Sequence, residues 1–332
     1  MSEEKIMSLA MIISQPGGPE VLKAVERESV SPGPDEVRIR HEIIGVNFVD
    51  IYFRSGLYPQ PYPQAVPGFE GAGVVTATGS NVSAFAAGDR VAYTGNPMGA
   101  YAESRNIPAS RLIRIPDGVD TRTAGSAMLR GLTAHMLLNK VREVRAGDWI
   151  LVHSAAGGLG QIVTRWATMK GARVIGTTGS PEKVATARLA GASEVLLHTE
   201  AAWPEKVRDI TEGYGVHLAI DGIGGTMLSR TLSVVRPFGT VASLGQPAGP
   251  IPPVRVEELG FARSIALMRP SSLAYTDDAA LYRKGASDLM SALSAGLESH
   301  IGAEFTLTDA AEAHRVLEAG HTTGSVILTV QD

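Results

Sequence analysis

Three closely spaced glycines mark a place where the chain could bind a phosphate group. Gly157, Gly158 and Gly160 follow a hydrophobic stretch and precede an amphipathic helix expected to begin near Gln161. A dinucleotide pyrophosphate needs close backbone approach and free N–H groups at a helix N-terminus, and large side chains would block it. Ala155 replaces the first glycine of the G-x-G-x-x-G fingerprint, so the prediction depends on the strand, turn and helix context. The backbone contacts expected are Ala156, Gly157, Gly158, Leu159 and Gly160. A tight turn that binds no ligand is the alternative.

The end of the next strand indicates which nicotinamide cofactor to expect. NAD sites carry a carboxylate about 20 residues beyond the glycines, where it accepts bonds from the ribose 2′-hydroxyl. Here the strand ends without a carboxylate, and Thr178, Ser180 and Lys183 follow. Hydroxyls and a cation can hold a 2′-phosphate, and no Asp is there to repel it, so the residues favour NADPH. The alternative is that Ser180 caps the next helix and Lys183 is an ordinary solvated residue.

Strands and helices alternate in the second half of the chain with the spacing of βαβ units. Six strands in one open, mostly parallel sheet is the number expected of a doubly wound dinucleotide-binding domain. The fold class is therefore α/β with a Rossmann domain. The expected strands are 149–153, 173–178, 194–198, 217–221, 239–244 and 264–268.

The first third of the chain has the pattern of β-structure, because short alternating apolar runs between residues 7 and 116 are separated by Gly, Pro, Asn and Asp. One short helix is expected at residues 47–56, and on it Asp50 and Arg54, four residues apart, predict an intrahelical ion pair. A small barrel-like or bent-sheet domain suits this pattern. Later elements are expected to complete it: helices near 277–295 and 309–318, and strands near 304–307 and 325–330.

Composition narrows the function classes. A chain of 332 residues suggests two domains. The absence of cysteine excludes disulfides, thiolate nucleophiles, iron–sulfur clusters and cysteine zinc sites. A formal net charge of −4 argues against nucleic acid or an anionic membrane as partner. No long apolar run and no signal-peptide pattern are seen, which predicts a soluble cytoplasmic protein.

Five stretches resemble the medium-chain dehydrogenase/reductase superfamily, and specifically its zinc-free quinone oxidoreductase branch of zeta-crystallin-like NADPH:quinone reductases. They are residues 44–58, 66–73, 130–134, 153–160 and 269–271, and the similarity extends over residues 7–330. The resemblance implies a GroES-like β-rich domain of residues 1–125 and 272–332, with a Rossmann domain of residues 126–271 inserted between its halves.

The resemblance also bears on metal binding. Zinc-dependent relatives have a cysteine where this chain has Asn47 and a histidine where it has Phe69, so no metal site is expected. Glu70 persists from the ligand motif, and we expect it to be a buried hydrogen-bonding partner. Without a metal, the interconversion of alcohols and ketones has no Lewis acid to polarise the carbonyl. Hydride transfer to a quinone needs less assistance.

The activity implied by the resemblance is hydride transfer from NADPH to a quinone in the cleft between the domains. Asn47 and Tyr52 are the expected catalytic residues. Asn47 resembles the family residue that contacts the nicotinamide ribose or the substrate oxygen, and Tyr52 could donate a hydrogen bond to that oxygen. Aromatic packing is the alternative for Tyr52.

Further cofactor positions are carried over from the family. His198 stands where close relatives have a tyrosine near the adenosine, and Leu244 replaces a family aromatic ring beside the nicotinamide. Arg269 is a cofactor-edge residue or a domain-interface ion pair. The expected cofactor-binding set therefore also contains Asn47, Thr133, Thr178, Ser180, Lys183, His198, Gly222, Ser243, Leu244, Gly245 and Ser325.

Two other activities remain open at this point. A zinc-free NADPH-dependent enoyl or alkenal reductase needs the same cofactor, with Tyr52 as a possible proton donor. A protein that binds NADPH without turnover is the second alternative. A homodimer formed through the sixth strand, near residues 264–268, is expected as in the relatives, because a lone sheet would leave this edge unpaired.

Overall fold

The computed structural model describes residues 7–261 and 263–330. The chain forms two units, Met1–Arg130 with Thr276–Asp332, and Gly131–Tyr275. The division falls within helix α2, Thr121–His135, which continues as a turn of π-helix at Met136–Val141. The boundaries inferred from the family resemblance, at residues 126 and 271, remain a prediction.

The Gly131–Tyr275 unit contains a six-stranded sheet in the order β10-β9-β8-β11-β12-β13, with every pair parallel. This is the 3-2-1-4-5-6 order of a doubly wound sheet, in which the order of strand addition reverses between β8 and β11. The Rossmann prediction is confirmed. The strands are β8 Trp149–Val152, β9 Arg173–Thr178, β10 Glu194–Leu197, β11 Val216–Asp221, β12 Val235–Ser243 and β13 Ala266–Met268.

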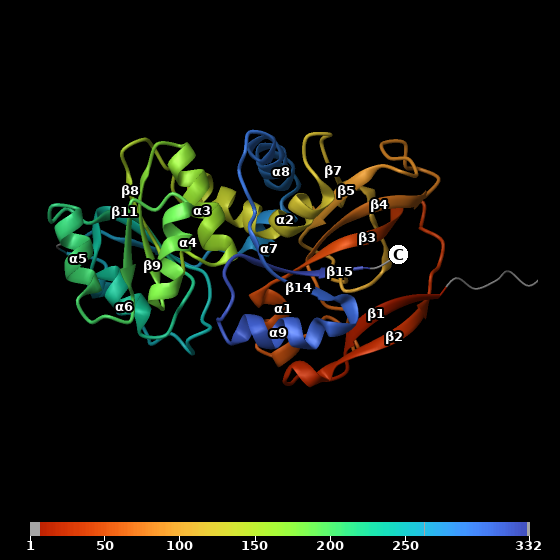
Figure 1. Ribbon diagram of the computed structural model, residues 1–332, viewed down its shortest axis with the longest axis horizontal. Helices are drawn as coiled ribbons and strands as arrows, with labels where there is room; N and C mark the ends of the chain where they lie inside the picture. Colours follow the sequence, from red (N-terminus) through yellow and green to blue (C-terminus); the bar gives the residue numbers. More distant parts are fainter. Residues whose placement is uncertain (1–6, 262, 331–332) are drawn as a thin grey trace, which may run out of the picture. The chain divides into compact units, whose positions relative to one another are not determined.

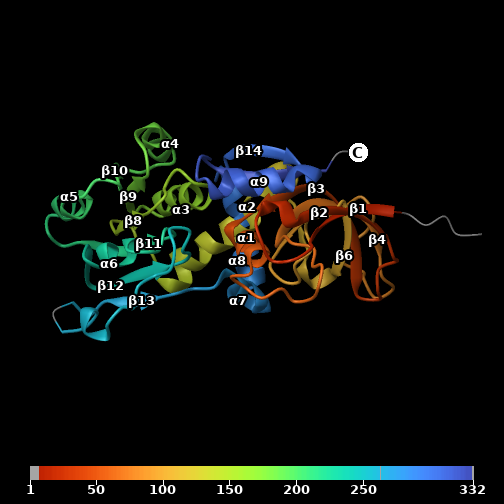
Figure 2. The same ribbon diagram turned by 90° about the horizontal axis from the view of Figure 1, so that it is seen from below.

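Helices cover both faces of this sheet, so its strands are mostly apolar rather than alternating. In Figures 1 and 2 the strands lie between α3 and α4 on one side and α5 and α6 on the other. Trp203 and Val207 of α5, with Leu228 and Leu232 of α6, form a buried cluster with sheet residues that include Leu151. The helices are α3 Gly158–Met169, α4 Val184–Leu189, α5 Trp203–Ile210 and α6 Met227–Leu232.

Strand β12 begins four residues before the expected position. Pro237, Phe238 and Gly239 have the composition of a turn, and Phe238 has a positive φ of 60°. The pairing of β11 with β12 shifts register at this point, between Val216 and Leu218, so the chain accommodates an irregularity without leaving the sheet.

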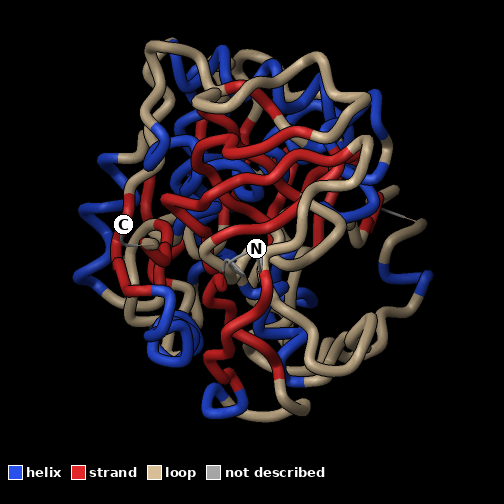
Figure 3. Tube along the Cα trace, turned by 90° about the vertical axis from the view of Figure 1, so that its right-hand side faces the viewer, coloured by secondary structure: helices blue, strands red, loops and turns tan. Residues whose placement is uncertain are grey.

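The other unit is built on a seven-stranded sheet, in which β6 pairs with β3 beside the path β14-β15-β3-β4-β5-β7. Strands β1 and β2 form a separate antiparallel pair. In Figure 3 the strands are joined mostly by loops, as the glycine and proline signals predicted. The strands are β1 Met7–Ile13, β2 Leu22–Glu28, β3 Glu36–Val46, β4 Glu70–Thr78, β5 Arg90–Thr94, β6 Ser104–Pro108, β7 Ile113–Arg114, β14 Ile301–Thr306 and β15 Ser325–Thr329.

The C-terminal segment adds two strands to this sheet. Strand β15 pairs antiparallel with β3, with Ile327 opposite Gly45, and β14 pairs parallel with β15. The helices of this unit include α1 Phe48–Ser55, α8 Ala279–Ser294 and α9 Ala310–Glu318, and α7 Ser272–Asp277 crosses the division after Tyr275. None of the described helices is long and apolar enough to cross a membrane.

Candidate active site

The glycine turn joins β8 to α3, and its geometry requires small residues. A Cβ on Gly160 would lie 2.3 Å from the carbonyl oxygen of Ser154 and 2.7 Å from the Cα of Ala155, closer than atoms can approach. Helix α3 begins at Gly158, three residues before the expected start, so the glycines form its first turn. The side chain of Gln161 donates to the carbonyl of Ala156 at 2.8 Å and holds the turn.

Ala155 replaces the first glycine of the fingerprint without disturbing this turn. It is completely buried, and its backbone N–H donates to the carbonyl of Thr177 on β9 at 2.9 Å. The neighbouring residue on β9 is Gly176, where a Cβ would lie 2.8 Å from the Cβ of Ala155. The glycine on β9 therefore provides the space that the alanine methyl occupies.

The N-terminus of α3 fits a dinucleotide pyrophosphate. The first N–H groups of a helix have no intrahelical acceptor, and the helix dipole makes them favourable for an anion. Gly157, Gly158 and Leu159 are partly exposed there, so a ligand could reach their backbone. The clash that any side chain at Gly160 would cause is the structural reason for the glycine pattern.

Past β9, the residues expected to hold a 2′-phosphate lie on consecutive turns. The Thr178 hydroxyl donates to the carbonyl of Ser180 at 3.1 Å. Ser180 occupies the N-cap position of the short 3₁₀ helix Pro181–Lys183 but makes no side-chain bond to that helix. Its hydroxyl instead hydrogen-bonds the exposed carboxylate of Glu182, which lowers the pKa of that carboxyl. The Ser180 side chain therefore does not cap the next helix, which was the alternative to a role in phosphate binding.

His198 follows β10 and lies beside the same turn. Its Nδ1 is 3.1 Å from the Thr177 hydroxyl, and a Cβ on Gly179 would lie 3.3 Å from its Nε2. The strand ends therefore bring Thr178, Ser180 and His198 into one corner of the sheet, although 18 residues of sequence separate the last two.

The carboxyl end of β11 carries a buried carboxylate that belongs to none of the sequence motifs. Asp221 Oδ1 accepts bonds from the backbone N–H groups of Ile223 at 2.8 Å and Gly224 at 3.1 Å. Among the described residues, its Oδ2 has no hydrogen-bond partner, and burial raises the pKa of Asp221. The signal for it in the sequence was a lone acidic residue at the end of a hydrophobic strand.

Other predicted positions lie near this carboxylate, because Asp221 on β11 stands opposite Ser243 on β12. Gly222 follows Asp221 directly, and the Leu244 N–H donates to the carbonyl of Asp221 at 2.8 Å. Ser243 is buried at the end of β12, with Arg269 Nη1 3.5 Å from its hydroxyl. Gly245 continues the segment that leaves β12.

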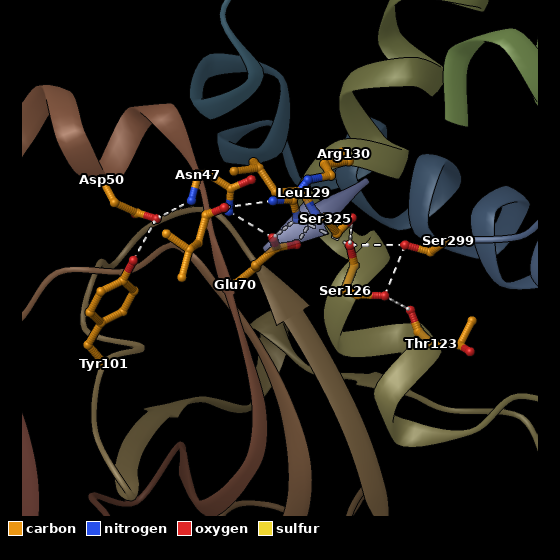
Figure 4. Close-up of polar contacts among 11 residues, drawn as sticks. Asn47, Asp50, Glu70, Tyr101, Thr123, Ser126, Leu129, Arg130, Ser299 and Ser325 are labelled. Carbon is orange, nitrogen blue, oxygen red and sulfur yellow. Dashed lines mark hydrogen bonds and ion pairs between the residues drawn. The ribbon is translucent and has the colours of Figure 1, made fainter. Parts of the chain in front are cut away.

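In the other unit, Glu70 is the centre of a buried network (Figure 4). Its Oε1 accepts from the Asn47 amide at 2.7 Å and from Arg130 at 2.8 Å, and its Oε2 accepts from the Leu129 N–H at 2.6 Å. Arg130 also donates to the carbonyl of Val46 at 2.6 Å. The side chain of Glu70 is completely buried. The expected structural role of Glu70 is confirmed.

Glycine makes this network possible. A Cβ on Gly45 of β3 would lie 1.9 Å from Glu70 Oε1, so any side chain there would displace the carboxylate. Asn47 follows β3 directly and stands at the N-cap of α1. A carboxylate only accepts hydrogen bonds, so the NH₂ of Asn47 must face Glu70, and this assigns the orientation of the amide. The carbonyl Oδ1 of Asn47 is then the acceptor that points away from Glu70.

The expected ion pair between Asp50 and Arg54 is wrong. Arg54 binds Glu318 of α9 through two bonds of 2.8 and 2.7 Å, and it is 3.2 Å from His314 Nδ1. Asp50 Oδ2 instead accepts from the N–H of Asn47 at 2.8 Å and from the Tyr101 hydroxyl at 3.3 Å. Packing of α9 beside α1 supplies a better carboxylate for Arg54 than its own helix does.

Asp50 is completely buried, and its Oδ1 has no hydrogen-bond partner among the described residues. Burial raises the pKa of Asp50 to about 8, against the opposing bond from Asn47, and the nearby charge of Glu70 adds to the increase. A carboxyl with this pKa is largely protonated at neutral pH, which removes the cost of a buried unpaired charge.

Three further predicted residues lie on α1, β15 and α2. Tyr52 is half-buried on α1, and its ring contacts those of Phe48 and Tyr58 with centroids 6.3 and 5.4 Å away. Ser325 donates to the carbonyl of Ser126 at 3.3 Å. Thr133 is buried on α2.

The residues at the zinc positions do not form a metal site. Asn47 directs its amide N–H at Glu70, and Phe69 is a buried apolar ring. Glu70 has both oxygens occupied by Asn47, Arg130 and Leu129. Among residues 7–261 and 263–330, no group of three or more His, Cys, Asp or Glu side chains could hold a metal ion.

A doubly wound sheet with a glycine turn at a helix N-terminus defines a dinucleotide-binding domain. The zinc-binding dehydrogenase family matches residues 158–278, and the alcohol dehydrogenase GroES-like domain matches residues 33–117. These matches confirm the fold class: a Rossmann domain together with a GroES-like domain.

Individual proteins extend the similarity over nearly the whole chain. A quinone oxidoreductase of Pseudomonas aeruginosa is 40% identical over 94% of this chain and 96% of its own. A 2-haloacrylate reductase of a Burkholderia species is 39% identical over 98% of this chain and 100% of its own. The solved structure of Escherichia coli quinone oxidoreductase complexed with NADPH superposes with a TM-score of 0.93 and 34% identity, covering 97% of this chain and 100% of that one. The chain belongs to the quinone oxidoreductase branch of the medium-chain dehydrogenase/reductase superfamily, and it is an oxidoreductase.

Proposed function

We propose that this enzyme reduces a quinone with NADPH, by direct hydride transfer and without a metal. The observation that supports a reaction without a metal is that the carboxylate oxygens of Glu70 are already hydrogen-bonded. Both of its oxygens accept hydrogen bonds within the protein, from Asn47, Arg130 and Leu129. NADPH supplies the hydride. The relatives named quinone oxidoreductase, at up to 40% identity over nearly their full length, support a quinone as the acceptor.

The backbone at the start of α3 would hold the pyrophosphate of NADPH. The residues proposed for this contact are Ala156, Gly157, Gly158, Leu159 and Gly160. Thr178, Ser180, Lys183 and His198 would surround the 2′-phosphate, because the β9 corner offers hydroxyls and a cation where NAD sites have a carboxylate. The remaining cofactor contacts proposed are Asn47, Thr133, Gly222, Ser243, Leu244, Gly245 and Ser325.

Asn47 is proposed to accept a hydrogen bond from the nicotinamide ribose. Its NH₂ is committed to Glu70 at 2.7 Å, which leaves the carbonyl Oδ1, the acceptor of the capping box at the start of α1, as the group with a lone pair to offer. A carbonyl oxygen binds a ribose hydroxyl but cannot donate to a quinone oxygen. Of the two roles inferred from the family, this orientation favours the ribose contact.

Tyr52 is proposed to donate its hydroxyl hydrogen to the quinone oxygen that gains charge as the hydride arrives. A donor aimed at such an oxygen stabilises the transition state more than the ground state. The rings of Phe48 and Tyr58 pack against Tyr52 and would limit its rotation.

Stopped-flow oxidation of NADPH by the purified enzyme with 1,4-benzoquinone tests this proposal. We expect turnover with NADPH and slow turnover with NADH. Tyr52→Phe should lower kcat by about 10²-fold, the usual cost of one oxyanion donor. Tyr58→Phe removes a neighbouring hydroxyl and should leave kcat unchanged. Asn47→Ala should raise the KM for NADPH. Equal kcat values for Tyr52→Phe and the unaltered enzyme would exclude Tyr52 as the donor.

Reduction of an activated carbon–carbon double bond is the second candidate. The 2-haloacrylate reductase that is 39% identical over 98% of this chain supports it. The same experiment with a 2-alkenal and with 2-chloroacrylate in place of benzoquinone separates the two. Turnover with the unsaturated compounds alone would make this activity the correct one, and tight binding of NADPH with no turnover would indicate a binding protein.

A homodimer formed through the edge of the six-stranded sheet is also proposed. Strand β13 pairs only with β12 in the described sheet, and exposed apolar side chains lie nearby, including Val256, Phe261 and Met268. Light scattering should give twice the chain mass, reduced by Met268→Lys and unaffected by Leu189→Lys at an exposed site on α4. A monomer mass for the unaltered protein would exclude the dimer.

A cytoplasmic location remains a prediction, which cell fractionation would test.

A further inference from the structure

A chain of hydrogen-bonded side chains crosses the carboxyl ends of β8, β9 and β10. His153 Nε2 lies 2.8 Å from the Thr231 hydroxyl, and His153 Nδ1 lies 2.8 Å from the Thr177 hydroxyl. The same Thr177 hydroxyl lies 3.1 Å from His198 Nδ1. The far end of the chain is anchored on α6, where the Thr231 hydroxyl donates to the carbonyl of Met227 at 2.9 Å.

The direction of every hydrogen bond in this chain can be assigned. A threonine hydroxyl has a single hydrogen, and Thr231 gives it to Met227, so Thr231 must accept from the Nε2–H of His153. Burial lowers the pKa of His153 to about 3, so this ring is neutral and its Nδ1 is an acceptor. Thr177 therefore donates to His153, and its remaining lone pair accepts from His198.

His198 must consequently carry a hydrogen on Nδ1, which leaves Nε2 as its titrating nitrogen. This nitrogen lies beside Gly179, where a Cβ would be 3.3 Å away. Gly179 directly precedes Ser180, so Nε2 faces the corner that the proposed function assigns to the 2′-phosphate.

The charges around His198 explain why this nitrogen carries no hydrogen in the free protein. Burial lowers the pKa of His198, and the positive charges of Lys183 on the 3₁₀ helix and Arg230 on α6 lower it further. His153 behind it is neutral. Of the nearby carboxylates, Glu182 is bonded by Ser180, and Glu200 is paired with Lys206 at 2.6 Å.

We propose that His198 takes up and keeps a proton at Nε2 when NADPH binds and donates a hydrogen bond from this N–H to the 2′-phosphate, which makes the preference for NADPH over NADH depend on pH. This inference rests on the proposed use of NADPH. The proton comes from solvent, and Thr177 holds the ring in place through Nδ1 in both states. A dianionic phosphate would counter the charges of Lys183 and Arg230, and it would repel an unprotonated Nε2 lone pair.

Linkage fixes the sign of the pH effect. Because bound phosphate raises the pKa of His198 above its free value, NADPH affinity should weaken by up to about tenfold per pH unit between the two values as the pH rises. Affinity for NADH, which lacks the 2′-phosphate, should not show this dependence.

The test counts protons taken up on binding, and it needs no turnover. Calorimetric titration of the protein with NADPH and with NADH at pH 7, in buffers of different ionisation enthalpy, gives the number directly. His198→Asn keeps a donor toward Thr177 but removes Nε2. His198→Gln places a non-titrating donor near Nε2. The 2′-phosphate itself titrates near pH 6, and the two variants supply that background.

We expect the unaltered protein to take up more protons with NADPH than either variant, and all three to behave alike with NADH. His198→Gln should keep NADPH affinity with little pH dependence, whereas His198→Asn should lose affinity. Preference for NADPH with equal proton counts in all three proteins would overturn this inference alone. An absence of preference for NADPH over NADH would overturn the proposed cofactor and this inference with it. Far-UV circular dichroism and imidazole ¹⁵N spectra of the unaltered protein check folding and the Nδ1–H tautomer independently of the variants.

Discussion

The glycine turn of the six-stranded sheet and the Glu70 network of the seven-stranded sheet, both assigned to the proposed cofactor site, are built by opposite means. The turn presents backbone, and its essential feature is the absence of side chains at positions such as Gly160. The Glu70 network presents side chains, and its essential feature is a buried carboxylate with three donors. A backbone site depends on local sequence, whereas a side-chain site depends on partners brought together by folding. A single substitution should therefore have different consequences in the glycine turn and in the Glu70 network.

The largest expected effect is on the Glu70 network. Glu70→Gln should lower the free energy of unfolding by about 3–5 kcal/mol, because it leaves the Arg130 guanidinium buried without its counter-charge. Urea unfolding followed by fluorescence would measure it. Glu304→Gln is the matched control, since Glu304 pairs with Arg122 on the surface and such pairs contribute about 0–1 kcal/mol. Similar losses for both variants would contradict the importance given to burial.

Gly160→Ala should have the next largest effect, on binding more than on folding. The added Cβ would displace the Ser154 carbonyl or the start of α3, at a cost of about 1–3 kcal/mol of stability. NADPH affinity, measured by fluorescence titration, should fall by about tenfold or more, the equivalent of 1.4 kcal/mol. Gly118→Ala, where a Cβ meets nothing within 4 Å, is the control. Unchanged affinity in Gly160→Ala would remove the glycine turn from the proposed cofactor site.

Asp50 should show an effect that appears only as a dependence on pH. Its pKa is raised to about 8 in the folded protein, above its ordinary value of 3.8. Between these values the folded state holds a proton that the unfolded state releases, so stability falls as the pH rises, by up to about 1.4 kcal/mol per pH unit.

Asp50→Asn abolishes this slope, so its stability relative to the unaltered protein should improve from pH 5 to pH 8. Urea midpoints across that range would measure the change. Asp35→Asn, at an exposed carboxylate bonded to Asn81, is the control and should follow the unaltered protein. Parallel pH profiles for Asp50→Asn and the unaltered protein would show that Asp50 is ionised when buried.

Much of the fold could be predicted because its signals are local. Strand β9 was expected at the residues it occupies, since β-branched residues fill it and turn signals bound it. A helix start near Gln161 is three residues late, because glycines are poor helix formers and only the packing of the turn admits them. The β12 strand was shortened for a similar reason, because its irregular start at Pro237–Gly239 resembles a turn.

The pairing of charged residues could not be predicted in this way. Asp50 and Arg54 satisfy the spacing rule for an intrahelical pair, yet Arg54 binds a carboxylate 264 residues away. Asn47 and Glu70 are 23 residues apart, and Glu70 and Arg130 are 60 apart. Spacing along one helix describes an isolated helix, and it fails when another element brings a competing partner to the same face.

The sequence by itself determined the class of fold, the place of the glycine turn and the lack of a carboxylate at the end of β9 itself, because each depends on residues adjacent in the chain. Only the tertiary structure decided which way the Asn47 amide faces and which nitrogen of His198 titrates. Both answers follow from hydrogen bonds to residues on other strands and helices, whose single hydrogens and lone pairs leave one consistent assignment.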